Sequence, residues 1–384
     1  MVATRVLDAL RAGPCGRRLI VAAEGQTGVW LVGGAVRDIL LGREPRELDV
    51  AVEGDAEALA RRLGDVDALH ERFGTATVSA GDCRYDVART RSEHYPEPGA
   101  LPDVRPAPLT EDLRRRDVTV NAIAVSLSDG GVEAVPGALE DLHGRVLRVL
   151  HDRSFEDDPT RVWRIARYAV RLGFAVEPAT ARLAAHARPG AVSGERFGHE
   201  LRLSLGEDDP CSIFERLREL QPMALPEGFD PRPDGVAEAL SLLPDDGRRD
   251  LVVLAACCAR MSLELLQRWL DHLQFPAADR DLVLAASRWV TGAPLRAANT
   301  PSQIGRAASG APVEAVALAG GPNARRWLDE LRHVRLEITG EDLLAAGMPQ
   351  GPPIGAGLRR ALDAKLDGRA AGRAEELAVA LGER

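Results

Sequence analysis

Between residues 29 and 149, short apolar runs alternate with stretches of helical spacing. The runs are rich in β-branched residues and bounded by glycine or charged residues, so they predict strands. The predicted strands are Val29–Val32, Leu48–Val52, Thr75–Ala80, Arg84–Ala88 and Asn121–Leu127. Apolar residues three and four positions apart predict helices over Ala35–Leu41 and Ala56–Leu63. This alternation indicates a mixed α/β region.

Two segments beside these elements lack such spacing. Residues 92–110 contain five prolines and predict a loop. Residues 1–26 predict one short helix followed by a glycine-containing link.

From about residue 152 onward the apolar spacing is helical. The expected helices cover residues 159–172, 177–187, 195–205, 211–220, 234–242, 249–258, 262–271, 277–290, 301–308, 312–319, 322–332, 341–346, 355–366 and 371–381. The whole pattern predicts an α+β fold. We expect a mixed-sheet domain over residues 1–146, a helical segment over 147–205 and a helical remainder over 206–384.

The amino-acid composition indicates which class of protein this is. The chain has 384 residues, of which 45% are hydrophobic and 28% charged, which is typical of a soluble globular protein. The apolar run Leu251–Cys258 is far shorter than a membrane span, and the N-terminus lacks a signal-peptide pattern. We therefore expect a cytoplasmic protein. The five cysteines show no CxxC spacing, so we expect reduced thiols, Cys257 and Cys258 among them, and no zinc site.

Charge limits how the chain could hold phosphate. The net charge of −9 does not indicate nucleic-acid binding, although a negative total still allows a local basic groove. Lys365 is the only lysine in the sequence. Any phosphate contact must therefore use an arginine guanidinium or a backbone N–H group.

Two glycines close the first predicted strand, in the stretch Leu31–Asp38. Gly33 and Gly34 would let backbone N–H groups approach phosphate oxygens closely, and the N-terminus of the following helix favours anions. Arg37 adds a cation one turn later. A plain tight turn explains the same residues equally well.

Acidic residues flank the start of the second strand. Glu47 and Asp49 alternate with Leu48, so both carboxylates share one face while Leu48 points to the core. Neighbouring carboxylates repel each other unless a cation joins them, and Mg²⁺ suits such a pair. Asp86, on another predicted strand, is a candidate third carboxylate. The alternatives are a solvent-facing edge strand and, for Asp86, a surface residue or a salt bridge to Arg84.

Three consecutive arginines precede the last predicted strand, in the stretch Arg114–Ala122. Arg116 would bind a triphosphate, while Asp117 or Asn121 would hydrogen-bond a ribose hydroxyl. The alternative is a solvated basic turn.

A predicted helix carries Arg161, Arg164 and Arg167 on one side, with Asp158 one turn before Arg161. Cytosine and adenine both present an exocyclic amine beside an acceptor ring nitrogen. A carboxylate accepts from the amine and a guanidinium donates to the nitrogen, whereas uracil and guanine present the reverse order. Asp158 and Arg161 would therefore admit CTP and ATP. Alternatively, Asp158 before Pro159 is a helix N-cap, and the arginines coat a surface helix.

In this order and spacing the motifs resemble the class II tRNA nucleotidyltransferases and bacterial poly(A) polymerases of the polymerase β superfamily. The similar stretches are Leu31–Asp38, Glu47–Asp49, Arg72–Val78, Pro98–Pro102, Glu111–Ala122, Asp157–Phe174, Glu195–Leu201, Ile338–Leu344 and Gly351–Gly368. The resemblance implies a seahorse-like protein with head (1–146), neck (147–205), and body and tail (206–384).

The resemblance also implies an activity and the roles of its residues. It implies addition of CCA to tRNA 3′ ends from CTP and ATP, with Mg²⁺, in a two-metal site, as cofactor. The implied metal ligands are Glu47 and Asp49, and the implied substrate-binding residues are Gly33, Gly34, Arg37, Arg116, Asp117, Asn121, Asp158, Arg161, Arg164 and Arg167. The tRNA 3′ end is the expected partner, and no obligate protein partner is evident.

Two positions depart from the family pattern, and two other functions stay open. The family has Asp where Glu47 stands and usually Phe or Leu where Val118 stands. An enzyme that adds only A, only C or a poly(A) tail is one alternative, because Val52–Asp55 and Pro98–Pro102 resemble members that include A-adding forms. A catalytically silent RNA-binding protein with a decayed metal site is the other, and Glu47 is its only support.

Overall fold

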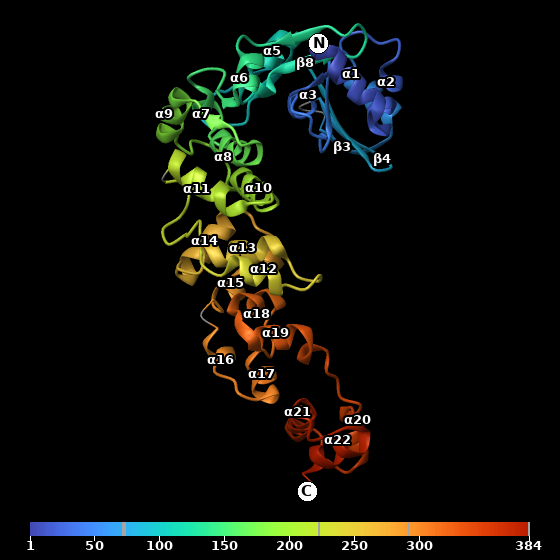
Figure 1. The fold of residues 1–384 in the computed structure, drawn as a ribbon, viewed down its shortest axis with the longest axis vertical. Coiled ribbons are helices and arrows are strands. Elements are labelled where there is room, and N and C mark those ends of the chain that lie inside the picture. The colour runs from blue at the N-terminus through green and yellow to red at the C-terminus, as the bar shows by residue number, and fades with distance from the viewer. Residues whose placement is uncertain (71–73, 222, 291, 383–384) are drawn as a thin grey trace. The chain divides into compact units, whose positions relative to one another are not determined.

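Seven strands form one mixed sheet within the described residues, which are 1–70, 74–221, 223–290 and 292–382 of this computed structural model. The strand order is β3-β4-β5-β2-β1-β8-β9, and Figure 1 labels β3, β4 and β8 of this sheet. Their bounds are β1 Val29–Val32, β2 Leu48–Val52, β3 Asp65–His70, β4 Thr75–Ala80, β5 Cys83–Arg89, β8 Ile123–Ser126 and β9 Val132–Ala134. The predicted strands at 29–32, 48–52, 75–80 and 84–88 are confirmed. The start of the predicted motif Arg72–Val78 lies outside the described residues.

One parallel pairing sets the register of the functional strands. β2 pairs with β5 in parallel, and Asp49 lies opposite Asp86 in this register. The flanking pairs Leu48–Tyr85 and Val50–Val87 are buried. Because side chains alternate between the faces of a strand, these apolar pairs point into the core and the two aspartates share the other face.

Helices surround this sheet, and several of them were predicted. They are α1 Val2–Ala12, α2 Pro14–Ala23, α3 Gly33–Leu40, α4 Ala56–Leu63, α5 Leu109–Arg114 and α6 Ala138–Gly144. The prediction of one helix in residues 1–26 is wrong, because Gly13 adopts an extended conformation and Pro14 begins a second helix. Proline is favoured in the first turn of a helix, where its missing N–H costs no hydrogen bond.

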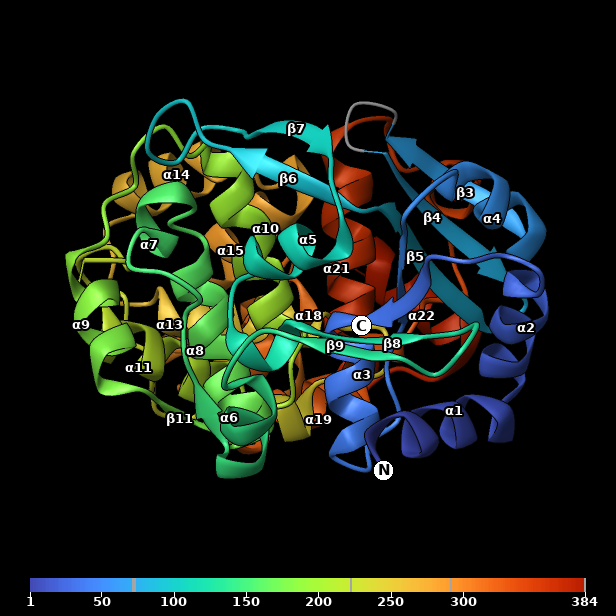
Figure 2. The same ribbon diagram turned by 90° about the horizontal axis from the view of Figure 1, so that it is seen from above.

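The predicted loop over residues 92–110 is instead a hairpin. Strand β6, Arg91–His94, pairs in antiparallel register with β7, Asp103–Pro106, beside α5 (Figure 2). Pro96, Pro98 and Pro102 all fall in the connection, and Pro106 ends the ladder. The prolines therefore remove few hydrogen bonds between the two strands, and their number alone wrongly predicted a loop.

The predicted strand Asn121–Leu127 begins two residues too early. Thr119–Asn121 form a 3₁₀ turn, in which the N–H of Asn121 bonds the carbonyl of Val118 at 3.0 Å. The polar side chains of this turn are buried, and Thr119 donates to Asp141 at 2.7 Å while Asn121 donates to Asp117 at 2.9 Å. Those contacts, which apolar spacing does not report, hold the turn out of the sheet.

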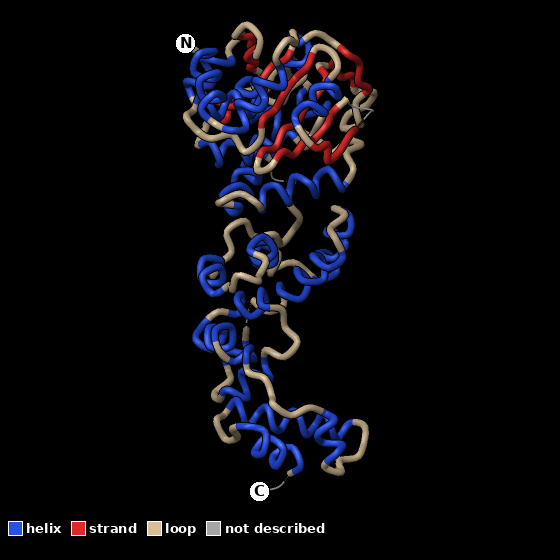
Figure 3. The backbone as a smooth tube through the Cα atoms, turned by 90° about the vertical axis from the view of Figure 1, so that its right-hand side faces the viewer, coloured by secondary structure: helices blue, strands red, loops and turns tan. Residues whose placement is uncertain are grey.

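The chain after residue 150 is helical, as predicted, and Figure 3 shows the strands gathered in the N-terminal part of the described chain. The helices are α7 Ser154–Asp157, α8 Arg161–Leu172, α9 Pro178–His186, α10 Gly194–Leu205, α11 Pro210–Leu220, α12 Val236–Leu242, α13 Arg249–Cys257, α14 Leu263–His272, α15 Ala277–Ser287, α16 Ala293–Arg296, α17 Pro301–Ala307, α18 Val313–Ala319, α19 Gly321–Asp329, α20 Gly340–Ala345, α21 Pro352–Leu366 and α22 Gly372–Leu381. The short strands β10 Val146–Leu147 and β11 Ala175–Val176, and the four-residue helices α7 and α16, were not predicted.

Two compact units divide the fold. One comprises residues 1–200 with 216–224 and holds the sheet, and the other comprises residues 201–215 with 225–384 and is helical. In the second unit, residues 251–257 of α13 are all buried, so this apolar run is a core helix. No helix among the described residues combines the length and apolar character needed to cross a membrane. The expected boundaries at residues 146 and 205 stay predictions.

A disulfide in the first unit contradicts the expectation of reduced cysteines. Cys15 of α2 is bonded to Cys83, the first residue of β5, across 68 positions of sequence. The hydroxyl of Tyr85 also donates to the carbonyl of Cys15, at 2.9 Å. The fold brings these distant residues together, so local spacing gave no signal of the pairing. Cys211, Cys257 and Cys258 are free, and the last two are buried, as predicted.

This disulfide leads to a first prediction. Replacing both Cys15 and Cys83 by serine should lower the stability of the first unit by up to about 4 kcal/mol, because the bond closes a loop of 68 residues. Calorimetric melting of the variant and the unaltered protein measures the loss, and Cys211→Ser is the control that keeps the bond. Thiol titration of the protein in denaturant without reductant should count three cysteines, and a count of five would contradict the bond.

Candidate functional site

Three carboxylates converge on one face of the sheet, and we call Glu47, Asp49 and Asp86 the carboxylate cluster. One carboxylate oxygen from each lies within 4.8 Å of the others. The parallel register brings Asp86 beside Asp49, and Glu47 joins from the residue just before β2. Sequence spacing predicted the shared face of Glu47 and Asp49, and left Asp86 open. The solvent-facing alternative fails for Asp49 and Asp86, which are half-buried.

The electrostatics of the cluster reflect its crowding. Burial raises the pKa of Asp49 to about 6; the nearby Arg116 opposes the rise, while Glu47 and Asp86 add to it. Burial and the charge of Asp86 also raise the pKa of Glu47, against the opposing charge of Arg84. Arg84 pairs with Glu47 at 3.6 Å, so the suggested salt bridge forms with Glu47. Like charges held together in this way favour a bound cation.

The donor set fits a hard divalent ion. Carboxylate oxygens are the ligands that Mg²⁺ prefers, and two oxygens on opposite sides of one such ion lie about 4.2 Å apart. The three oxygens, which lie within 4.8 Å of one another, can close on one such ion by side-chain rotation. Glu47 reaches the cluster although its side chain is longer than the aspartate of the family pattern.

The diglycine turn, Gly33–Gly34, lies against the same cluster. Gly33 has a positive φ of 69°, and a Cβ there would lie 2.8 Å from Nη1 of Arg116 and 3.3 Å from Oδ2 of Asp49. A Cβ on Gly34 would lie 3.5 Å from the same carboxylate oxygen. The backbone N–H of Ala35 hydrogen-bonds Asp49. Glycine at position 33 is therefore required both by conformation and by the close approach of two charged groups.

Arg116 stands between the turn and the α5 helix. Its Nη2 pairs with Asp112 at 3.0 Å, and its Nη1 donates to the carbonyl of Asn121 at 3.4 Å. Its Nε is buried and has no hydrogen-bond partner in the described structure. Arg115 also pairs with Asp112, at 2.7 Å. Both guanidiniums are mostly buried, so the alternative of a solvated basic turn is wrong for these two residues.

Arg37, Asn121 and Asp117 form a buried chain behind the turn. Arg37 is 2% exposed; its Nε donates to Asp38 at 2.8 Å and its Nη1 to Oδ1 of Asn121 at 2.6 Å. The amide of Asn121 donates to Asp117 at 2.9 Å. Burial alone would raise the pKa of Asp117, but the ion pair with Arg164 and the bond from Asn121 hold it well below its usual range.

The arginines of α8 point toward these residues rather than coating a surface. Arg164 pairs with Asp117 at 2.7 Å, and Arg167 pairs with Glu200 of α10 at 3.2 Å. Arg161 is 5% exposed and donates to the carbonyl of Arg115 at 2.8 Å. The alternative of a solvated surface helix is therefore wrong.

Asp158 does not cap α8, which begins at Arg161 with Thr160 as its N-cap. Oδ1 of Asp158 accepts from the N–H of Thr160 at 3.0 Å and from its hydroxyl at 2.6 Å. Arg196 of α10 pairs with the same oxygen at 2.8 Å. The structure thus ties Asp158 to Arg196, whereas Arg161 bonds Ser154 and Arg115.

Known proteins resemble this chain in sequence. Residues 29–148 match the family described as the poly A polymerase head domain. The A-adding tRNA nucleotidyltransferase of Geobacter sulfurreducens is 32% identical over 94% of this chain and 46% of its own length. The CC-adding enzyme of Deinococcus radiodurans is 43% identical over 47% of this chain and 50% of its own. The multifunctional CCA protein of Thioalkalivibrio sulfidiphilus is 30% identical over 68% and 74%, respectively.

The chain belongs to the tRNA nucleotidyltransferase family. Solved structures agree: a CCA-adding enzyme in an apo form has a TM-score of 0.77 at 28% identity, covering 98% of this chain and 95% of its own. A CCA-adding enzyme in complex with ATP has a TM-score of 0.76 at 25% identity, covering 99% and 95%. The resemblance inferred from the motifs and the predicted fold class are confirmed. The chain spans half or less of the length of the A-adding and CC-adding relatives.

Sequence reasoning missed several residues that hold the candidate site. Thr77 of β4 donates to Asp86 at 2.9 Å, because it lies opposite Asp86 in the antiparallel register. Asp112 is buried and bonds both Arg115 and Arg116. Its spacing of three and four residues from these arginines, at the end of α5, was a usable signal, whereas Thr77 could be found only from the sheet register.

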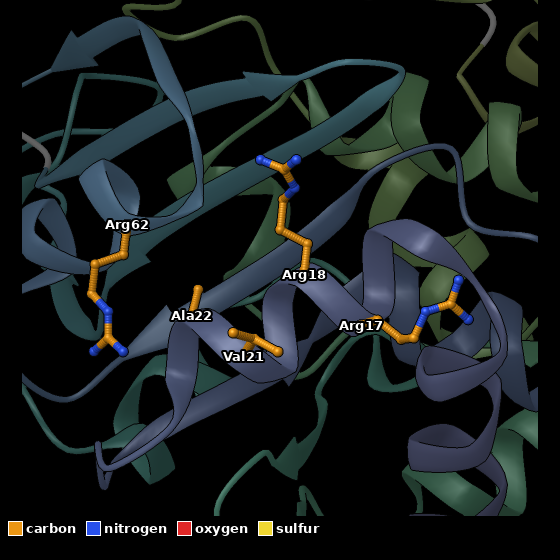
Figure 4. A pocket seen from close by; sticks show the side chains of 5 residues that line it. All are labelled: Arg17, Arg18, Val21, Ala22 and Arg62. Atoms are coloured by element: carbon orange, nitrogen blue, oxygen red, sulfur yellow. The ribbon is translucent and has the colours of Figure 1, made fainter.

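An open hollow of about 470 Å³ elsewhere on the first unit is lined by Arg17, Arg18, Val21 and Ala22 of α2 and Arg62 of α4. Figure 4 shows its three guanidinium groups pointing in different directions. Arg18 and Arg62 also donate to the backbone carbonyls of Leu63 and Glu24. These side chains do not converge, so the hollow is a poor candidate for the site.

The raised pKa of Asp49 leads to a second prediction. In metal-free protein the folded pKa of about 6 exceeds the ordinary value of 3.8, so the folded state binds more protons between these values. Stability should therefore fall as pH rises from 4 through 6, by up to ~3 kcal/mol. Asp49→Asn should remove this decline in chemical unfolding curves measured in chelator.

Divalent metal provides the matching control. Metal binding requires the ionised carboxylates, so added Mg²⁺ or Mn²⁺ should restore stability at pH 8 and much less at pH 5. A pH-independent unfolding free energy in metal-free unaltered protein would contradict the crowding of the cluster.

Proposed function

We propose that this chain is a metal-dependent tRNA nucleotidyltransferase that adds C, C and A to tRNA 3′ ends from CTP and ATP. The observation that carries the proposal is the carboxylate cluster lying against the diglycine turn. A triphosphate on the turn would have its phosphate oxygens next to the ions that the cluster is suited to hold. The family to which the chain belongs supports the same reaction class.

Different residues of the chain would bind different parts of the triphosphate and its metal ions. Glu47, Asp49 and Asp86 would hold the Mg²⁺ ions, which lower the pKa of the attacking 3′-hydroxyl and neutralise phosphate charge when bound. Gly33 and Gly34 offer close backbone approach, and Arg116 offers the cation, with a free buried Nε–H. Arg37 lies behind the turn, and a Cβ on Gly34 would be 3.4 Å from its Nη2. Its direct contact with phosphate stays a prediction.

Base choice is assigned to Asp158 and Arg161. The contacts of Asp158 with Thr160 and Arg196 converge on Oδ1, so Oδ2 is suited to accept from the amine of cytosine or adenine. Arg161 uses Nη1 and Nη2 to bond Ser154 and Arg115, and its Nε–H and remaining Nη–H donors suit the ring nitrogen. The fixed order of acceptor and donor disfavours uracil and guanine. Asp117 and Asn121 are assigned to the ribose side, and Arg164 and Arg167 to further contacts.

A single-A-adding enzyme is the second candidate. It is favoured by the A-adding relative, whose similarity extends over 94% of this chain. A silent RNA-binding protein is less well supported, because Glu47, its only argument, places a carboxylate oxygen within the cluster.

A nucleotide-addition assay separates these functions. The protein is incubated with tRNA ending at the discriminator base, at C, or at CC, together with CTP, ATP or both, and the product ends are sequenced. CCA made only with both nucleotides supports the proposal. Addition of A to the CC end alone, or a long A tail on generic RNA, identifies the alternatives. No extension with either Mg²⁺ or Mn²⁺ would refute all of these enzymes.

The metal assignment gives the third prediction. Asp49→Ala should reduce extension by at least about a thousandfold, since that factor corresponds to ~4 kcal/mol of lost transition-state stabilisation. Binding of tRNA, measured by filter retention, should stay within twofold or so of the unaltered protein. Asp82→Ala, in the exposed β4–β5 turn, is the matched control. Near-normal extension by Asp49→Ala would remove Asp49 from the metal site.

The base-reading assignment gives the fourth prediction. Asp158→Asn should raise incorporation of UTP relative to CTP by roughly tenfold, because an amide can donate to a keto oxygen where a carboxylate cannot. Competition assays with mixed triphosphates measure the ratio. Glu156→Gln, a largely exposed carboxylate two residues away, is the control. An unchanged ratio in Asp158→Asn would overturn the assignment.

A further inference from the structure

Three guanidinium groups surround one buried aromatic ring in the first unit. The ring of Tyr168, on α8, lies 5.3 Å from Cζ of Arg167, 5.4 Å from that of Arg37 and 5.8 Å from that of Arg164. Tyr168 is 7% exposed. Ring faces attract cations, most strongly away from water. One ring thus contacts three guanidinium groups, each of which also pairs with a carboxylate.

The hydroxyl of Tyr168 extends this arrangement to Asp117. It donates to Oδ2 of Asp117 at 3.2 Å and accepts from Nη2 of Arg164 at 3.0 Å. Asp117 is bound in turn to Asn121, which accepts from Arg37. Burial raises the pKa of Tyr168, so the phenol keeps its proton and continues to donate. A closed ring of contacts therefore passes through Tyr168, Asp117, Asn121 and Arg37.

This ring joins two parts of the site that are far apart in sequence. Arg37 belongs to α3, which begins at the diglycine turn, whereas Arg164 and Arg167 belong to α8, which carries Arg161. We propose that Tyr168 is a positioning residue that fixes the phosphate-binding turn and the base-reading helix at one spacing. The inference rests on the proposed function, and it makes triphosphate binding and base choice depend on the same side chain.

The proposal separates binding from chemistry. The carboxylate cluster is held by the register of β2 and β5 and by Thr77, none of which involves Tyr168. Loss of the ring should therefore weaken the grip on the nucleotide and leave the chemical step at saturation nearly intact. Weakened positioning should appear mainly in KM and in base selectivity.

The test compares Tyr168→Leu with Tyr168→Phe. In single-nucleotide addition with CTP and with ATP, Tyr168→Leu should raise KM about tenfold or more, raise UTP misincorporation about tenfold, and keep kcat within about threefold. Tyr168→Phe keeps the ring and should restore KM to within about fourfold of normal. Trp163→Leu, also buried on α8, is the control for lost packing and should leave selectivity unchanged.

Two results would overturn the proposal. One is an unchanged KM and selectivity in Tyr168→Leu, and the other is an equal change in Trp163→Leu with the same loss of melting temperature. If Tyr168→Leu does not fold, a double-mutant cycle of Tyr168→Phe and Asp117→Asn tests the proposal. The KM of the double variant should match that of Asp117→Asn alone, because both changes remove the same hydrogen bond. A KM change equal to the product of the two single changes would show that the residues act independently and would refute the proposal.

Failure of the proposed function is distinguishable from failure of this inference. If the unaltered protein extends no RNA, the function is wrong, and Tyr168 is judged by binding and spectroscopy. Calorimetric Kd values for CTP and ATP should rise about tenfold in Tyr168→Leu. The ring-shifted Nε–H resonances of Arg37, Arg164 and Arg167 in arginine-labelled protein should move to ordinary positions. Unchanged Kd values and resonances would refute the inference on their own.

Discussion

Repulsion among three carboxylates is the constraint on which the site depends. The parallel register of β2 and β5 forces Asp49 and Asp86 onto the same face, and neither can turn away without moving the apolar pairs from the core. The register is therefore maintained by apolar burial on the opposite face of the sheet. Hydrophobic packing thus supplies the energy that keeps the acidic groups together, and this crowding is what makes the cluster suited to divalent ions.

Ion pairs between arginines and carboxylates support the site around this cluster. Four buried or partly buried guanidiniums have a carboxylate partner: Arg37 pairs with Asp38, Arg164 with Asp117, Arg167 with Glu200 and Arg171 with Asp38. A planar fork donates in several directions at once, so one arginine can bond a carboxylate and still lie over an aromatic ring. Lysine, which occurs once in the sequence, could not make both contacts with one fixed group. Through Arg171, Arg164 and Arg167, these pairs connect α8 to α3, to Asp117 and to α10.

The features that could be predicted from the sequence are those that depend on residues close together in the chain. The strand at Leu48–Val52 and the shared face of Glu47 and Asp49 depend on alternation within a few residues, and both were predicted. Asp86 stayed open because its place depends on pairing between strands that are not neighbours in sequence. The Cys15–Cys83 bond was not predicted either, because it joins α2 to β5 across 68 positions of sequence. Proline counting misjudged residues 92–110, because the effect of a proline depends on whether it faces the ladder.

Glu47 illustrates how a departure from a family pattern is compensated by position. It precedes β2 and its side chain is 41% exposed, whereas Asp49 lies within the strand and is half-buried. A longer side chain from this edge can still bring an oxygen to within 4.8 Å of both aspartates, while Arg84 holds it from the solvent side. The extra methylene adds rotational freedom, which a metal with strict octahedral geometry must restrict on binding. The substitution therefore bears on how tightly the ion is held, and the convergence of the three oxygens argues against a decayed site.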